Sequence, residues 1–370
     1  MVLAPLVVAI GRDLDASLSA VGLARSVLAA TAVAVSLAIG PLIDRIGGRP
    51  LIVAGAGLAL IGCGLSAAAP SMPFFYAAQI VVGGGVACLL SAGFAGVAAY
   101  FRDDQAAWAL GWVVGAQAIA WVVGNPVIGL LADHGSWRLA YLVPAAMATL
   151  ALAAGLTAPR VRPAAGTGLA GQGLRAVLRD RSARRWVLAE LVAYSAWTAE
   201  ITYVGAFYIH TYGASESAVG FLLSVGSLVF VVTSVNVVRL NERIPRRPLM
   251  LISALLMGLL LIPVLNLTPS VWFTLALFCL FAFFAAVRST AASGLGLAQL
   301  PEQAGSMMAA RTASAQLGYM IGAAAGGGVL ALADFGTLGF VLCAGMAISA
   351  FLIARVSDPQ ARRSTAAARY

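Results

Sequence analysis

Five ionisable side chains lie within long apolar stretches of this chain: Arg25, Glu190, Glu200, Arg288 and Arg311. A charged side chain at the centre of a bilayer costs about 2.5–3.5 kcal/mol on insertion scales, so such residues are candidates for function. Glu200 lies near the middle of its stretch, where loss of water favours a protonated carboxyl group. We predict that it carries a proton; the alternative is a structural carboxyl bonded to a hydroxyl.

The other four residues have structural alternatives. Glu190, Arg288 and Arg311 are expected to form an ion cluster, because buried charges usually pair. The alternative is that Arg288 or Arg311 binds an anion. Arg25 lies near the end of its apolar stretch. Its guanidinium is either a functional group within the membrane, or it extends to the membrane surface and has no function there.

Aromatic residues accompany Glu200 within the stretch 186–210. At 100° per residue, Tyr194, Trp197, Glu200 and Phe207 fall within about 140° of a helical wheel and can share a face. An aromatic wall with one carboxylate suits amphipathic or cationic organic molecules, whereas packing against a neighbouring helix is the alternative. Weaker candidates for the same kind of binding surface are Gln79, Gln117 and Trp121.

The composition indicates an all-α integral membrane protein. Of its 370 residues, 61% are hydrophobic and 10% are charged, whereas a soluble protein has about 25% charged residues. Because a spanning helix needs about 20 apolar residues, we predict eleven spans: about 20–43, 50–70, 74–100, 106–131, 139–158, 186–210, 217–240, 248–266, 270–298, 306–333 and 335–356. The first apolar run, 1–11, is half a span, so we expect a twelfth helix that begins upstream of Met1.

Two charged segments about 200 residues apart repeat each other. Arg45–Leu51 and Arg243–Leu249 share five of seven positions. Such an internal repeat predicts two related halves. The expected domains are an N-terminal six-helix bundle (1–158), a cytoplasmic linker (159–185), a C-terminal six-helix bundle (186–357) and a cytoplasmic tail (358–370).

The arginines predict the orientation. If the segment around Asp44 is cytoplasmic, eighteen of the 23 basic residues fall on that side, and only Arg12 and Arg138 fall outside. This asymmetry is the positive-inside pattern, and it explains the net charge of +9 without nucleic acid. We expect a multi-pass protein of the plasma or inner membrane with a cytoplasmic C-terminus.

The sequence argues against an enzyme. Its four cysteines lie inside apolar runs without metal-ligand spacing. Only two histidines occur, on the predicted outer side, and no nucleophile with a base appears at membrane depth. We therefore expect no metal, no cofactor and no catalytic residue.

The segment Gly40–Arg49 resembles the loop between helices 2 and 3 of the major facilitator superfamily of secondary transporters. Pro126 and Gly129 look like the helix 5 signature of its drug/proton antiporter branch. The resemblance implies the twelve-helix fold of that family, a cavity lined by helices 1, 4, 7 and 10, and a latch that closes the cytoplasmic side in one state. A purely topogenic turn is the alternative for this segment. The implied latch residues are Gly40, Asp44, Arg45, Gly47 and Arg49. Glu242 is expected to have the same role as Asp44 in a weaker form.

These observations predict a secondary active transporter that moves a small organic solute by alternating access. Proton-coupled efflux is the first hypothesis, and an uptake permease for a metabolite or organic anion is the alternative. An intramembrane enzyme or a non-transporting sensor is a distant third. The expected partners are a small-molecule substrate, protons and the lipid bilayer, with the protein as a monomer.

Overall fold

Helices and short connections make up the described part of the computed structural model, which comprises residues 3–100, 105, 116, 117, 119–159, 170–237 and 244–358. Nine helical segments in these ranges are long and apolar enough to cross a membrane. Large apolar side chains on them face outward, including Leu259 at 58% and Val235 at 71% exposure. Exposed apolar surface along whole helices fits contact with lipid. The predicted all-α membrane fold is confirmed.

The chain forms two compact units, one of residues 1–167 and 202–224 and the other of residues 168–201 and 225–370. The linker residues 160–169 and the tail residues 359–370 lie outside the described ranges. The division of the sequence into six-helix bundles remains a prediction. The compact units differ from this predicted division, because α10 (Arg181–Tyr212) and α11 (Glu216–Asn236) each contribute residues to both units.

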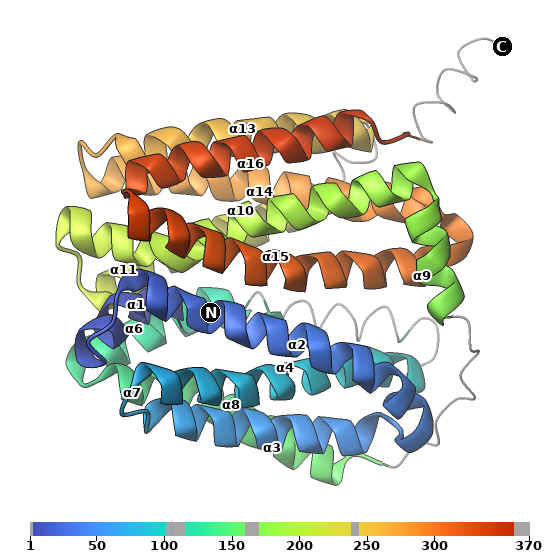
Figure 1. The fold of residues 1–370 in the computed structure, drawn as a ribbon, viewed down its shortest axis with the longest axis horizontal. Helices are drawn as coiled ribbons and strands as arrows, with labels where there is room; N and C mark the ends of the chain where they lie inside the picture. Colours follow the sequence, from blue (N-terminus) through green and yellow to red (C-terminus); the bar gives the residue numbers. More distant parts are fainter. Residues whose placement is uncertain are drawn as a thin grey trace. The chain divides into compact units, whose positions relative to one another are not determined.

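In the first unit, α3 packs against α4 and α8, and α2 packs against α4 (Figure 1). Small residues permit this closeness: a Cβ atom on Gly85 of α4 would lie 2.7 Å from the backbone nitrogen of Ala59 in α3. The rings of Phe75, Trp137 and Tyr141 meet edge to face in the core. The helices of this unit before the linker are α1 (Leu3–Asp13), α2 (Leu18–Ile46), α3 (Gly48–Ala67), α4 (Met72–Tyr100), α6 (Gly124–His134), α7 (Trp137–Ala140) and α8 (Leu142–Thr157).

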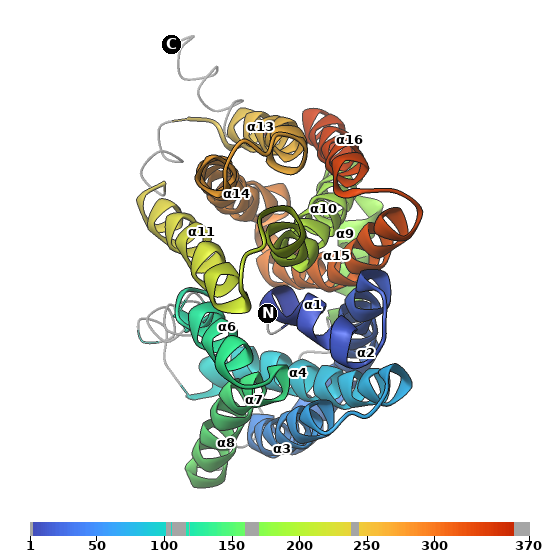
Figure 2. The ribbon, with the colours of Figure 1, turned by 90° about the vertical axis from the view of Figure 1, so that its left-hand side faces the viewer.

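In the second unit, α13 packs against α14 and α16, and α9 packs against α15. Trp186, Leu295 and Met307 are fully buried in its core. Figure 1 shows these helices from the side, and Figure 2 shows them nearly end-on. After α9 (Ala170–Arg179) come α10 (Arg181–Tyr212), α11 (Glu216–Asn236), α13 (Arg246–Asn266), α14 (Val271–Gln299), α15 (Ala304–Leu332) and α16 (Phe335–Ala354), with a 3-10 turn Pro301–Gln303 before α15.

The packing of the two units reflects the internal repeat. The two repeated segments lead into α3 and α13. Each of these helices packs against the helix that follows it and against the last helix of its half, α8 or α16. The structure therefore supports the inference of two copies of one unit.

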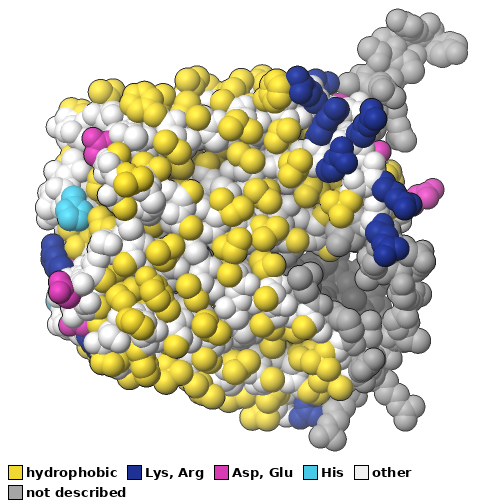
Figure 3. Space-filling view, viewed as in Figure 1, with side chains coloured by type: hydrophobic (Ala, Val, Ile, Leu, Met, Phe, Trp, Pro, Cys, Tyr) yellow, Lys and Arg dark blue, Asp and Glu magenta, His cyan; other side chains and the backbone are white. Residues whose placement is uncertain are grey.

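Basic side chains gather at one end of the second unit (Figure 3). The turns there are joined by polar contacts: Ser182 donates to Gln299 at 2.6 Å, and the backbone nitrogen of Ser357 donates to Ser182 at 2.8 Å. Arg185 donates to the carbonyl of Arg355 at 3.1 Å. Together these contacts bring the start of α10 and the ends of α14 and α16 to one arginine-rich end.

Candidate functional site

The helix α10 holds two glutamates that are buried in the described part of the second unit. Asp180 caps its start by accepting a hydrogen bond from the backbone nitrogen of Ala183 at 2.7 Å. From there the helix runs to Tyr212. Glu190 is fully buried, and Glu200 is 1% exposed. These carboxyl groups therefore have almost no contact with water, and each depends on the protein for its partners.

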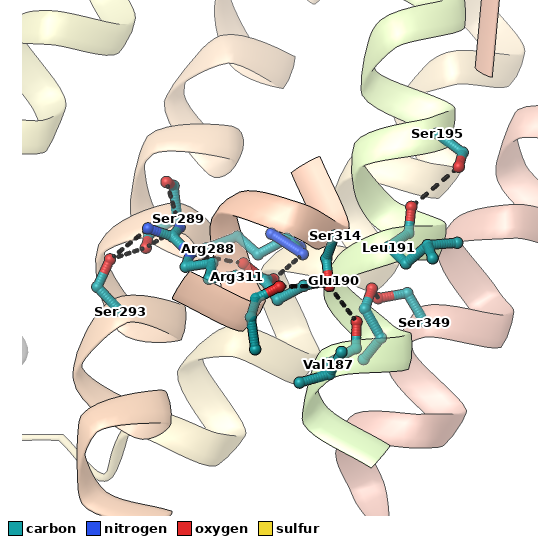
Figure 4. A network of polar contacts seen from close by, with 12 residues as sticks. Val187, Glu190, Leu191, Ser195, Arg288, Ser289, Ser293, Arg311, Ser314 and Ser349 are labelled. Atoms are coloured by element: carbon teal, nitrogen blue, oxygen red, sulfur yellow. Dashed lines mark hydrogen bonds and ion pairs between the residues drawn. The ribbon is translucent and has the colours of Figure 1, made fainter. Parts of the chain in front are cut away.

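Glu190 lies between two arginines from neighbouring helices (Figure 4). One carboxylate oxygen accepts a hydrogen bond from Nη2 of Arg288 in α14. The other accepts from Nε of Arg311 in α15 at 2.8 Å. The sequence predicted this cluster because buried charges usually pair, and the structure brings the three side chains together.

Serines complete the surroundings of Arg311. Its Nη1 donates to the hydroxyl of Ser293 at 2.8 Å, and its Nη2 donates to the carbonyl and the hydroxyl of Ser289, each at 3.1 Å. Two further serines fix α10 beside Glu190: Ser314 donates to the carbonyl of Val187 and Ser349 to that of Ala189. Sequence reasoning missed all four serines, because hydroxyls in helices usually bond to their own helix.

The cluster has unequal charges. Two guanidinium groups share one carboxylate, which leaves an excess of one positive charge. All three nitrogens of Arg311 have partners, whereas the buried Nε of Arg288 has no hydrogen-bond partner among the described residues. The spare donor capacity therefore lies on Arg288.

Glu200 has different surroundings from Glu190. Neither of its carboxyl oxygens has a hydrogen-bond partner within the described ranges, and the hydroxyls of Thr198 and Thr202 on the same helix also lack one. An ionised carboxylate without a partner is very costly in such a site. The neutral, protonated carboxylic acid is the form that this environment favours.

The three aromatic candidates on α10 lie in different places. Trp197 stacks on Phe281 of α14 with ring centres 5.6 Å apart and also contacts Phe230. Tyr194 meets Tyr319 edge to face and lies 5.9 Å from the guanidinium of Arg311. Phe207 is 2% exposed and belongs to the first unit. Of the three, only Tyr194 is next to the charge cluster.

The remaining cavity candidates lie in the first unit. Gln79 is 2% exposed and donates to the hydroxyl of Ser66 in α3 at 3.0 Å. Gln117 is exposed and Trp121 is partly exposed. The structure therefore places Gln79 in helix packing, and it shows no contact that brings these three residues together in the described ranges.

The predicted latch is only partly described. Gly40, Asp44 and Arg45 fall within α2, but their side chains lie outside the description, and so does the whole of Glu242. Gly47 has φ of 81°, a conformation that favours glycine, and it forms the turn into α3. Arg49 donates to the carbonyls of Gly155 at 3.0 Å and Leu156 at 2.6 Å, near the end of α8.

The helix 5 signature lies where α6 crosses the start of α11 in the first unit. A Cβ atom on Gly129 would lie 3.1 Å from Cα of Ser217, and one on Gly220 would lie 3.1 Å from Cα of Pro126. Ser217 also donates to Asp133 across this crossing. Sequence reasoning identified Gly129 only as part of the helix 5 signature, and it missed Gly220 and Ser217.

Two helical units related by an internal repeat, with ionisable groups buried in the helices, define the class of polytopic secondary transporters. A family profile of the Major Facilitator Superfamily matches residues 1–212 and 186–369. The chain belongs to the Major Facilitator Superfamily, and it is a transporter rather than an enzyme.

Individual relatives are more distant. The chain is 28% identical over 149 residues to the multidrug resistance protein MdtM of Salmonella typhimurium, an alignment that spans 40% of this chain and 36% of that protein. The fold is similar to that of the nucleoside transporter NupG, with a TM-score of 0.77 at 13% identity over 96% of this chain and 94% of that one. The D-xylose-proton symporter has a TM-score of 0.77 at 16% identity, over 96% and 93%.

Proposed function

We propose that this protein is a proton-coupled transporter of a small organic solute in which Glu200 binds and releases the coupled proton. The observation that carries the proposal is the burial of Glu200 within α10 with neither carboxyl oxygen bonded to a described residue. A carboxyl group in this setting is neutral while dry and releases its proton once water or a polar ligand reaches it. Alternating access supplies that change of environment.

Glu190 is not proposed for this role. Both of its oxygens accept hydrogen bonds, one from Arg288 and one from Arg311. The two glutamates of α10 therefore have different expected functions: Glu190 holds two arginines together, while Glu200 changes its protonation state.

The direction of transport has two candidates. Efflux by proton antiport is supported by the similarity to a multidrug resistance protein and by the helix 5 signature. Uptake of an organic anion together with a proton is supported by the excess positive charge at Arg288 and Arg311. The arginine asymmetry of the sequence supports an inner or plasma membrane location with the C-terminus in the cytoplasm. A monomer contains both related halves and is the proposed unit of function.

Everted membrane vesicles test the proposal. A compound collection is screened for solutes that dissipate or build a pH gradient, which a pH-sensitive dye reports, with the wild type and Glu200→Gln in parallel. Solutes whose flux changes the gradient in the wild type should leave it unchanged in Glu200→Gln at equal protein levels. Glu302→Gln, an exposed carboxylate of the same unit, is the control and should behave as the wild type. Unaltered coupling in Glu200→Gln would remove Glu200 from the mechanism.

A further inference from the structure

We propose that Arg288, held by Glu190 beside Arg311, binds the negatively charged group of a monovalent organic anion. This inference rests on the proposed function and names the substrate class for it. All the groups involved lie on α10, α14 and α15 within the second unit. The site is therefore built inside a single compact unit.

Of the two arginines in the cluster, only Arg288 has a buried nitrogen without an acceptor among the described residues. Each oxygen of Glu190 accepts from one guanidinium. Arg311 also bonds to Ser289 and Ser293, so each of its nitrogens has an acceptor. Arg288 has an unsatisfied Nε, although its side chain is only 6% exposed. A buried guanidinium with unused donors is suited to an acceptor that arrives from outside, such as a carboxylate.

The charges favour the same conclusion. One arginine would neutralise Glu190, and the second adds a positive charge that no other described acidic group contacts. A buried unbalanced charge is costly, and a purely structural ion pair has no need of it. An anion that arrives as substrate supplies the missing negative charge only when it is bound.

Arg311 is the more exposed arginine of the cluster, with 17% of its side chain exposed against 6% for Arg288. Tyr194, Ser289 and Tyr319 around it are also partly exposed. Tyr194 and Tyr319 meet edge to face and present aromatic surface next to the arginines. A small anion with an aromatic or apolar body therefore fits these surroundings better than an inorganic ion.

Glu200 connects the anion to the proton. Away from the helix ends, the described residues of the second unit include four ionisable groups: Glu190, Glu200, Arg288 and Arg311. The net charge of these four side chains is zero when Glu200 is ionised and the site is empty. The net charge of the site is zero again when Glu200 is protonated and a monovalent anion is bound. An organic cation would instead add to the positive charge, so the anion and proton are expected to move together.

Binding is measured on the purified full chain in detergent by the shift of its Tm. The probes are benzoate, benzamide and benzylamine, which share a ring and differ in charge, together with acetate, all at matched ionic strength. We expect benzoate to raise the Tm of the wild type, with no such rise from benzamide or benzylamine. Arg288→Gln should weaken benzoate binding by about 10–100-fold, as expected for loss of a charged hydrogen bond.

Three variants make the outcome decisive. Arg288→Lys keeps the charge and the fold and should bind benzoate with intermediate affinity, because lysine lacks the paired donors of arginine. Arg184→Gln, an exposed arginine of α10, should bind as the wild type. Glu200→Gln should still bind benzoate. A loss of proton coupling in this variant can therefore be distinguished from a loss of anion binding. The proposal is overturned if neither benzoate nor acetate shifts the wild-type Tm, if benzamide shifts it equally, or if Arg288→Gln and Arg288→Lys bind as the wild type.

Discussion

Arg49 and Arg247 occupy equivalent positions of the internal repeat and make equivalent contacts. Arg49 donates to the carbonyls of Gly155 and Leu156 in the last turn of α8. Arg247 donates to the carbonyl of Ala354, the last residue of α16. Each arginine thus satisfies free carbonyls at a helix C-terminus, where a positive charge is favourable. The repeated motif has this structural role in both units.

Replacing either arginine with glutamine should lower the stability of its own unit. The loss of a charged contact at a helix C-terminus is worth about 0.3–1 kcal/mol. We expect Arg49→Gln and Arg247→Gln each to lower the Tm in detergent by a few degrees, with Arg184→Gln unchanged. Because the two sites lie in separate units, their effects should add in the double variant. A Tm equal to that of the wild type in both single variants would show that these contacts do not stabilise the helix ends.

The crossing of α6 and α11 predicts opposite effects for two glycines of one helix. A Cβ atom on Gly129 meets the backbone of α11, whereas one on Gly124 has nothing within 4 Å. Gly129→Ala should destabilise the protein by about 1–3 kcal/mol through overpacking. Gly124→Ala should be neutral or stabilising, since alanine favours a helix. Thermal unfolding of the two variants compares them directly, and equal shifts would contradict the close crossing.

Glu190→Gln should strongly reduce the yield of folded protein. Removing one partner of a buried ion pair costs about 3–5 kcal/mol, because the remaining charges lose their compensation. The double variant Glu190→Gln/Arg311→Gln restores the original excess of one positive charge and should recover part of the yield. Size-exclusion chromatography of fluorescently tagged protein measures both. Wild-type yield of Glu190→Gln would mean that the cluster contributes little to folding.

The ion pair of Asp13 with Arg138 should contribute to stability in a pH-dependent way. A hydrogen bond from Arg138 holds the pKa of Asp13 below its usual value. A carboxyl with a lowered pKa stabilises the folded state at pH values above its unfolded pKa of about 3.9. This stabilisation is lost as the pH falls below that value. Both side chains are partly exposed, so the effect is small.

We therefore expect Asp13→Asn to lower the Tm slightly at neutral pH, and the difference from the wild type to shrink as the pH falls through the lowered pKa of Asp13. Asp15→Asn, an exposed neighbour with a φ of 49°, is the control, because asparagine tolerates this conformation. A Tm difference that persists unchanged at low pH would exclude the ion pair as its cause.

Apolar run length predicted the helices, because a bilayer imposes both length and composition on a spanning segment. The repeat around Arg49 and Arg247 predicted that α3 and α13 are equivalent helices of the two halves. Burial of charge predicted the contacts of Glu190 with its two arginines. These are strong constraints, and a single sequence is sufficient to reveal them.

Other features depend on packing that a sequence pattern does not contain. A helical wheel placed Tyr194 and Trp197 on one face, yet Trp197 stacks on Phe281 while Tyr194 lies beside Arg311. The contribution of α10 and α11 to both units arises from close approaches, such as Gly220 against Pro126. Such contacts depend on the shape of both helices at a crossing, and neither helix alone specifies them.

The central claim is that Glu200 carries the coupled proton, and the comparison of active transport with exchange tests it most directly. Proteoliposomes containing the wild type or Glu200→Gln are given a radiolabelled solute found in the vesicle screen. Accumulation is measured under an imposed pH gradient, and exchange of labelled for unlabelled solute is measured at equal pH inside and outside. We predict that Glu200→Gln loses accumulation but retains exchange, because a permanently neutral side chain permits solute movement without net proton transfer. Accumulation equal to that of the wild type would contradict the account.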